Sequence, residues 1–166
     1  MSNRLPCALM ACALLLAGCG FQVRDAARLP PEMGSTQLVI DDEYSQLARR
    51  VRLMLEQSGV RFVEGAEASA VLEIPENRVV TEVLTIADNA RVREYRVTHT
   101  VKFRLIDAQG QELIGWQTLR QAREISFDEQ KILATSREQE YVKKDLAETL
   151  ARLLVMRLET IYVSQG

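Results

Sequence analysis

The stretch of sequence that decides the fold is residues 94–105, EYRVTHTVKFRL. From residue 95 onward, apolar or aromatic side chains and one histidine alternate with cations and threonines. Such alternation predicts a β-strand with one buried face and one face left to solvent or a partner. The positions on the apolar face are Tyr95, Val97, His99, Val101, Phe103 and Leu105, and those on the polar face are Arg96, Thr98, Thr100, Lys102 and Arg104.

A second strand precedes this stretch. Residues 71–74 and 78–86 are rich in valine, threonine and isoleucine, and they predict one strand that passes through Pro75. Proline has no N–H to donate to a strand ladder, so Pro75 indicates either a sheet edge or a bulge. Asp88 and Asn89 predict the turn into the next strand, because both residue types favour turns.

A third strand follows the central one. Residues 107–110, DAQG, predict a tight turn, since aspartate and glycine are typical turn residues. Residues 112–126 then return as a strand, in which Gly115 marks an expected bulge. Three long strands joined by short turns predict an antiparallel meander at the centre of the domain.

An amphipathic helix precedes the meander. Apolar side chains recur at three-to-four spacing over residues 44–55, and most of the arginines fall on the other side. Asp41 or Asp42 is the expected N-cap, and Gly59 is the expected glycine at the C-terminal end. Residues 37–40, QLVI, predict a short strand before this helix.

The last part of the chain predicts a long helix. Leucine and isoleucine recur at helical spacing over residues 142–161 and form a continuous apolar stripe. Ser136 and Gln139 have the spacing of a capping box, which places the start of the helix near Ser136. Residues 128–133 add an expected short helical turn before that point.

The order of these elements is strand, helix, three-stranded meander and helix, with residues 60–63 either a short strand or the entry to a loop. A strand, helix and strand in succession can form a crossover, and the late helix can pack beside the first one. The chain therefore predicts an α+β fold: a two-layer sandwich with two helices packed on one face of a mixed four-stranded sheet. On the opposite face, Arg96, Lys102 and Arg104 form a candidate partner-facing strand.

The N-terminus carries a different signal. Arg4 precedes an apolar run over residues 5–17 that is shorter than the about 20 residues a spanning helix needs, which predicts a secretory signal peptide. Residues 16–19, LAGC, resemble a lipobox, which implies cleavage before Cys19 and lipidation of its sulfur and amine. An ordinary cleaved leader followed by a cysteine is the alternative, and it would leave an exposed, oxidisable thiol. Gly20, where lipoproteins retained at the inner membrane usually carry Asp, implies the outer membrane.

These signals divide the chain of 166 residues into three parts. Residues 1–18 are the predicted lipoprotein signal peptide, residues 19–35 a lipidated N-terminus and extended linker, and residues 36–166 a single α/β sandwich domain. Removing Arg4 with the leader from 21 Lys and Arg leaves 20 cations against 23 Asp and Glu, a net charge of −3. This mild acidity argues against a nucleic-acid partner, which requires a strongly basic face.

The sequence offers no constellation for catalysis. His99 is the only histidine, and its place on the apolar face indicates a hydrogen-bonded core residue rather than a general base, which needs reach to a substrate. One histidine and no cysteine beyond a lipidated Cys19 cannot assemble a usual zinc site. No glycine-rich phosphate loop and no Gly-x-Ser-x-Gly motif occur. We expect no enzyme, no metal and no cofactor other than the covalent lipid on Cys19.

Several short motifs, in their order and spacing, resemble the LptE family of lipopolysaccharide-assembly lipoproteins. The resemblance implies a lipoprotein anchored by palmitate and other acyl chains on the periplasmic side of the outer membrane. It also implies a plug inside the outer-membrane β-barrel LptD, a role in the assembly of that barrel, and lipopolysaccharide binding during transport. The motifs are Cys19–Arg24, Leu29-Pro30, Gly59-Val60, Glu94-Tyr95, Phe127-Asp128 and Leu133-Ala134, with the two helices between and after them.

The same resemblance implies where lipopolysaccharide is contacted. In the family, basic residues near the tip of the first long hairpin and near the start of the last helix are tied to this contact. The positions that align there in this chain are Asp88 and Thr135, so neighbouring cations become the candidates. The candidate lipopolysaccharide-contacting residues are Arg91, Arg93, Lys131 and Arg137.

Two other functions fit parts of the sequence. A generic lipid-tethered periplasmic adaptor for another envelope protein would share the lipobox and the sandwich. Depletion of the chain separates this adaptor from a lipopolysaccharide-assembly protein, because only the latter would reduce surface lipopolysaccharide and mature barrel. A small periplasmic hydrolase would require activity that is sensitive to His99→Ala.

Overall fold

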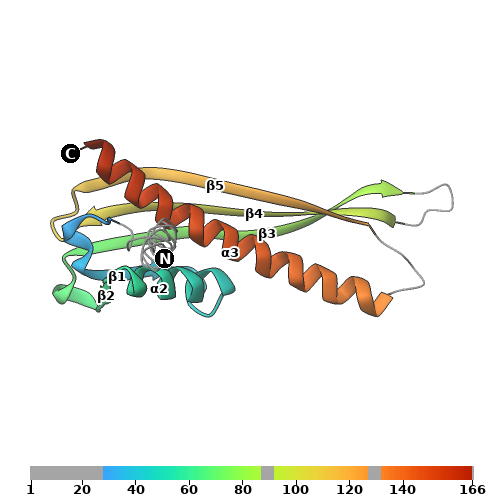
Figure 1. Ribbon diagram of the computed structural model, residues 1–166, viewed down its shortest axis with the longest axis horizontal. Helices are drawn as coiled ribbons and strands as arrows, with labels where there is room; N and C mark the ends of the chain where they lie inside the picture. The colour runs from blue at the N-terminus through green and yellow to red at the C-terminus, as the bar shows by residue number, and fades with distance from the viewer. Residues whose placement is uncertain (1–27, 87–91, 127–131, 166) are drawn as a thin grey trace, which may run out of the picture.

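The computed structural model describes residues 28–86, 92–126 and 132–165. Figure 1 shows two layers, with both α-helices on the same face of one long sheet. This arrangement confirms the predicted α+β sandwich. The elements are η1 (Pro31–Gly34), β1 (Ser35–Ile40), α2 (Gln46–Gln57), β2 (Arg61–Phe62), η2 (Gly65–Glu67), β3 (Ala70–Ile86), β4 (Val92–Asp107), β5 (Glu112–Ser126) and α3 (Ile132–Gln165).

The sheet has five strands in the order β2-β1-β3-β4-β5, rather than the predicted four. The strand β1 runs parallel to both of its neighbours, and the meander β3-β4-β5 is antiparallel. The additional strand is β2, which pairs with β1 through Ser35↔Arg61 and Thr36↔Phe62. It lies in the segment that the sequence left open between strand and loop, because two residues are too few to show a period.

The predicted irregularity at Pro75 is confirmed. In the register of β3 against β4, Glu73 pairs with Arg104 and Glu76 with Lys102, so β3 holds one extra residue and forms a bulge there. Pairing with β1 ends at Ile74, immediately before the proline. Pro75 therefore lies where β3 changes from an inner strand to an edge strand. On the side of β3 that faced β1, the missing N–H of the proline costs no ladder hydrogen bond.

The helix α2 begins later than predicted, and its N-cap is neither Asp41 nor Asp42. The side chain of Ser45 caps it by accepting a hydrogen bond from the backbone N–H of Ala48 at 3.1 Å. Asp42 instead accepts a hydrogen bond from the N–H of Tyr44 in the preceding turn at 2.9 Å. The aspartates are therefore turn residues.

The predicted C-terminal end of α2 is confirmed. Gly59 has φ +92°, a left-handed conformation that a glycine adopts at low cost. The backbone N–H groups of Ser58 and Val60 donate to carbonyl groups of the last helical turn, so the helix end is satisfied before the chain enters β2.

The long helix α3 begins at Ile132, so the expected capping box at Ser136 is wrong. Ser136 lies inside the helix, which starts within the segment that was predicted as a separate short turn. Its 34 residues give a length of about 51 Å at 1.5 Å per residue. The helix crosses the face of the meander along this length (Figure 1).

The folded domain starts before the predicted end of the linker. Residues 31–34 form the short helix η1, whose Met33 is fully buried in the core. Thr36 donates a hydrogen bond to the carbonyl oxygen of Met33 at 2.8 Å, and Ser69 donates to that of Glu32 at 2.6 Å. These contacts tie the end of the predicted linker to β1 and to Ser69, the residue that precedes β3. The rest of that linker, up to residue 27, lies outside the described residues.

Two groups of buried side chains hold the layers together. The main core lies where α2 and the second half of α3 cover β1, β3 and β4, and its largest members include Phe103, Leu150 and Leu154. The distal cluster consists of Val97, Ile125 and Leu146, with Val142 packed against it, nearer the first half of α3. The apolar face predicted for residues 95–105 is confirmed from Val97 to Leu105, since the alternate side chains there are buried.

Candidate functional site

The predicted partner-facing strand lies on the side of the sheet that no described helix covers, which we call the open face. The side chains of Arg96, Lys102 and Arg104 alternate along β4 with the buried side chains that contact the helices. The alternation alone places all three on the open face. The sequence therefore predicted the orientation of this strand correctly.

Most of the predicted cations on the open face are paired with carboxylates. The guanidinium of Arg104 bonds Glu73 at 2.6 Å and approaches Glu112 at 3.4 Å. The hydrogen bond that Arg104 donates to Glu73 is the main reason that the pKa of Arg104 is raised above its ordinary value, so this side chain stays charged. Arg96 bonds Glu124 through two of its nitrogens, at 2.7 and 3.2 Å.

An exposed tryptophan that was not predicted as a site residue lies on the open face beside Lys102 and Arg104. Lys102 Nζ lies 4.7 Å from the ring centroid of Trp116, and Arg104 Cζ lies 4.6 Å from it, both as cation–π contacts. Phe103 pairs with Gln117 and Leu105 with Ile114, so β5 bulges between these pairs and its alternation switches. The predicted bulge at Gly115 is therefore confirmed, and it turns Trp116, 42% exposed, to the open face.

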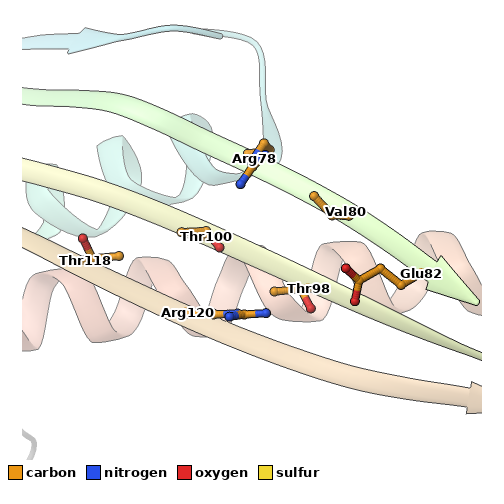
Figure 2. A pocket seen from close by; sticks show the side chains of 7 residues that line it. All are labelled: Arg78, Val80, Glu82, Thr98, Thr100, Thr118 and Arg120. Carbon is orange, nitrogen blue, oxygen red and sulfur yellow. The ribbon is translucent and has the colours of Figure 1, made fainter. Parts of the chain in front are cut away.

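A hollow of about 400 Å³ lies in the middle of the open face (Figure 2). Its floor includes Thr98 and Val80, two small side chains that pair across β4 and β3. Longer side chains stand in the rows before and after this pair. The lining residues are Arg78, Val80 and Glu82 of β3, Thr98 and Thr100 of β4, and Thr118 and Arg120 of β5.

The two arginines of this hollow were not singled out from the sequence. Arg78 and Arg120 both pair in register with Thr100, so they flank β4 at the same level. In Figure 2 they stand on either side of β4, with Thr98 and Thr100 between them. The only available signal was the alternation within each strand, because their common level depends on the register of three strands.

His99 is a core residue, as predicted. Its side chain is 2% exposed, and its Nε2 lies 2.8 Å from Oδ1 of Asn77. The amide nitrogen of Asn77 donates to Ser45 Oγ at 3.0 Å, so Oδ1 is left to accept and Nε2–H is the donor. Nδ1 is buried without a hydrogen-bond partner. Burial lowers the pKa of His99, and the neutral ring links β4, β3 and the N-cap of α2.

The candidate lipopolysaccharide-contacting residues are described only in part. Arg91 and Lys131 lie outside the described residues. Arg93 lies near the start of β4, and Arg137 is exposed on the first half of α3. The start of β4 and the start of α3 lie at the same end of the molecule in Figure 1, which we call the distal end. The backbone therefore brings Arg93 and Arg137 to one end.

The remaining candidate features are absent or outside the described part. Cys19, the predicted lipidation site, precedes the first described residue, Arg28. No group of three or more His, Cys, Asp or Glu side chains among the described residues could hold a metal ion. In the same part of the chain, no helix is long and apolar enough to span a membrane.

Two helices on one face of a mixed sheet, with the other face open and ion-paired, place the chain in the class of small α+β sandwich proteins. The sequence model of the family described as "LptE: Lipopolysaccharide-assembly" matches residues 35–158. The chain belongs to the LptE family, and this membership confirms the expectation that it is not an enzyme. The resemblance inferred from the short motifs is therefore confirmed.

Similar sequences cover nearly the whole chain. "LPS-assembly lipoprotein LptE" of Photorhabdus laumondii is 28% identical over 166 residues, which span 98% of this chain and 89% of that protein. The protein of the same name from Pectobacterium atrosepticum is 28% identical over 171 residues, covering 99% of this chain and 90% of that protein.

Solved structures support the same fold. The NMR structure of "uncharacterized lipoprotein B" from Nitrosomonas europaea has a TM-score of 0.72 at 23% identity, covering 87% of this chain and 93% of that one. The crystal structure of "rare lipoprotein B" from Shewanella oneidensis has a TM-score of 0.68 at 25% identity, covering 79% of this chain and 98% of that one.

Proposed function

We propose that this chain is a lipid-anchored lipopolysaccharide-assembly protein that plugs an LptD-like outer-membrane β-barrel, assists its assembly and binds lipopolysaccharide. Family membership and the names of the relatives support a role in lipopolysaccharide assembly. The plug role, the barrel partner and lipopolysaccharide binding are the finer parts of the proposal.

The observation that carries the plug role is the chemistry of the open face. The lumen of an outer-membrane barrel is polar, so a plug should present charges and hydroxyl groups that are already well paired. The open face meets this requirement through Arg96 with Glu124 and Arg104 with Glu73. Trp116 adds an exposed aromatic side chain, a residue type enriched in protein interfaces.

Lipopolysaccharide carries phosphate groups, and arginine suits their recognition because its planar guanidinium can make two parallel hydrogen bonds. We assign this contact to the distal end, where the start of β4 and the start of α3 lie (Figure 1). The candidate residues remain Arg91, Arg93, Lys131 and Arg137.

The anchor is proposed from the leader alone. Lipidation of Cys19 would hold the domain at the membrane, since each buried methylene contributes about 0.8 kcal/mol and several acyl chains act together. Gly20 after the cysteine supports the outer membrane as the destination, on the periplasmic side. Mass spectrometry of the mature N-terminus tests this: a triacylated Cys19 is expected, and a free thiol would contradict it.

The test of the plug role is a pull-down of the C-terminally tagged, lipidated protein from outer membranes in mild detergent. We expect one large β-barrel in equal amount. Trp116→Ala should reduce its recovery because that residue lies on the proposed docking face. Tyr141→Ala is the matched control, since it removes a 70% exposed aromatic side chain on α3 and should leave recovery unchanged. Recovery of another envelope protein without a barrel would favour the adaptor.

Lipopolysaccharide binding is tested separately. Reversing both Arg91 and Arg93 to Asp should weaken binding of lipopolysaccharide to the purified protein, because two attractive charges become repulsive. Unchanged affinity would remove these two residues from the site. Depletion of the chain should lower surface lipopolysaccharide and mature barrel together, whereas normal levels of both would contradict the assembly role.

A further inference from the structure

The hollow over Thr98 differs from the rest of the open face because its floor is unsatisfied. The side chain of Thr98 is 5% exposed, and its Oγ1 is buried without a hydrogen-bond partner. A buried hydroxyl without a partner costs free energy, so proteins usually satisfy such a group with a neighbour, a water or a ligand. The hydroxyl at the floor of this hollow therefore lacks a hydrogen-bond partner, which a ligand oxygen that reaches Thr98 Oγ1 would supply.

The positive charges of the hollow are also less neutralised than those elsewhere on the open face. No carboxylate lies within ion-pair distance of Arg120 in the described chain, and Arg78 approaches only Glu76 at 3.6 Å, with its side chain 70% exposed. In contrast, Arg96 and Arg104 each bond a carboxylate at 2.7 Å or less. Exposed pairs at the longer distance contribute little, so the hollow keeps a local positive charge.

The geometry suits a single compact oxyanion. Neighbouring strands lie about 4.8 Å apart, so the backbones at Arg78 and Arg120 are separated by about 10 Å across β4. Both side chains are long enough to reach a group held over Thr98 and Thr100, and threonine hydroxyls can donate to it. Glu82 lines the other end of the hollow, away from the row that holds Arg78 and Arg120, and Arg96 opposite it in register bonds Glu124.

We propose that this hollow binds one phosphate group of the lipopolysaccharide headgroup, as a site separate from the candidate residues at the distal end. The guanidinium groups of Arg78 and Arg120 would hold the phosphate oxygens in charge-assisted hydrogen bonds, with Thr98 Oγ1 donating from below. This inference rests on the proposed function, because it adds a second contact site for the lipopolysaccharide that the chain is proposed to bind.

The test compares binding of two probes to the full, lipidated protein in detergent: phosphorylated lipopolysaccharide, and the same lipopolysaccharide after enzymatic removal of its phosphates. We expect the double variant Arg78→Gln/Arg120→Gln to bind the phosphorylated probe at least about tenfold more weakly, since hydrogen bonds to charged groups are strong. It should bind the dephosphorylated probe as the wild type does. Arg157→Gln, an exposed arginine of α3 in the other layer, is the matched control and should bind both probes normally.

A second variant separates binding from folding. Thr98→Val keeps the shape of the side chain and removes its hydroxyl, so it should weaken binding of the phosphorylated probe about fivefold by deleting one donor. Its thermal midpoint should not fall, because it also removes a buried group that has no partner. Lower affinity together with an unchanged or higher midpoint is the pattern that a merely structural role would not produce.

The possible results separate failure of the phosphate site from failure of the proposed function. If the wild type binds lipopolysaccharide and the double variant binds it equally well, the hollow is not a phosphate site and the proposed function stands. If the wild type does not bind lipopolysaccharide, that part of the proposed function fails. Titration with inorganic phosphate then tests whether the hollow binds phosphate at all. If the NMR signals of the amides of residues 98 and 100 shift in the wild type and not in the double variant, free phosphate is the ligand. If these signals do not shift, the phosphate site is overturned.

Discussion

Among the side chains that the structure describes, the two halves of the molecule bury very different amounts of apolar surface under the same helix. The main core joins 21 of these buried hydrophobic residues, whereas the distal cluster joins three. In the distal half, Val79 and Val83 on β3 remain 40% and 47% exposed. Regions with few buried contacts open at low free-energy cost. The difference indicates that the half with the main core supplies most of the stability, and that the distal half opens at a lower free-energy cost.

The largest loss of stability should come from shortening a side chain of α3 that is buried in the main core. Leu154 is fully buried there, so Leu154→Ala leaves a cavity among well-packed neighbours that cannot collapse easily. We expect it to lower the free energy of unfolding by about 4–5 kcal/mol. Urea-induced unfolding of the purified protein measures this loss, and an unchanged dependence on denaturant serves as the control for two-state behaviour.

The same substitution eight residues earlier tests the distal half. Leu146 is 1% exposed but belongs to the three-residue cluster, whose neighbours can relax toward the vacated space. Leu146→Ala should therefore cost about 2–3 kcal/mol, less than the change at Leu154. Equal losses in the two variants would show that the halves are equally well packed and would remove the basis of the comparison.

The smallest effect concerns the boundary between the halves, where His99 stands between Val97 of the distal cluster and Val101 of the main core. Because burial lowers the pKa of His99, the unfolded chain takes up a proton near the ordinary value of 6.5 while the folded chain stays neutral. Stability should thus be fully present above this value and fall as the pH drops below it.

The histidine contribution can be isolated by comparing the wild type with His99→Gln at pH 7.5 and pH 5.5. Carboxylates give both proteins the same background dependence on pH, so the difference between them reports His99 alone. We expect the wild type to lose more of its unfolding free energy than the variant between these two pH values. An equal loss would mean that the ring is protonated in the folded state.

Features of the fold that depend on local pattern were predicted from the sequence. The alternation in residues 95–105 set the buried and open faces of β4, because the period of two is a property of the strand itself. The end of α2 followed from Gly59 in the same way, since a glycine takes the left-handed conformation at low cost.

Features that depend on distant contacts were missed. Ser45 was not distinguishable from Asp41 or Asp42 as a cap, because what favours it is a hydrogen bond from Asn77 on another strand. Met33 was assigned to a linker because its burial depends on strands that follow it in the chain. For Ser45 the partner Asn77 is 32 residues away.

In the candidate site, too, features set by local alternation were predicted and features set by the register of the sheet were missed. Alternation placed Arg96, Lys102 and Arg104 on the open face, but the register of the sheet selects their carboxylate partners. Trp116 faces them only because the bulge at Gly115 switches the alternation of β5. The level at which Arg78 and Arg120 meet is likewise set by the register of three strands, and no single strand encodes it.

The bulge at Pro75 has one more consequence, for behaviour at high concentration. Beyond Ile74 the outer side of β3 has no strand partner among the described residues, and such a bare edge is a template on which another chain can add and begin an aggregate. Bulges and charged side chains along an edge oppose this addition, and Glu76 and Glu82 supply such charges here. We therefore expect this edge to resist self-association of the chain.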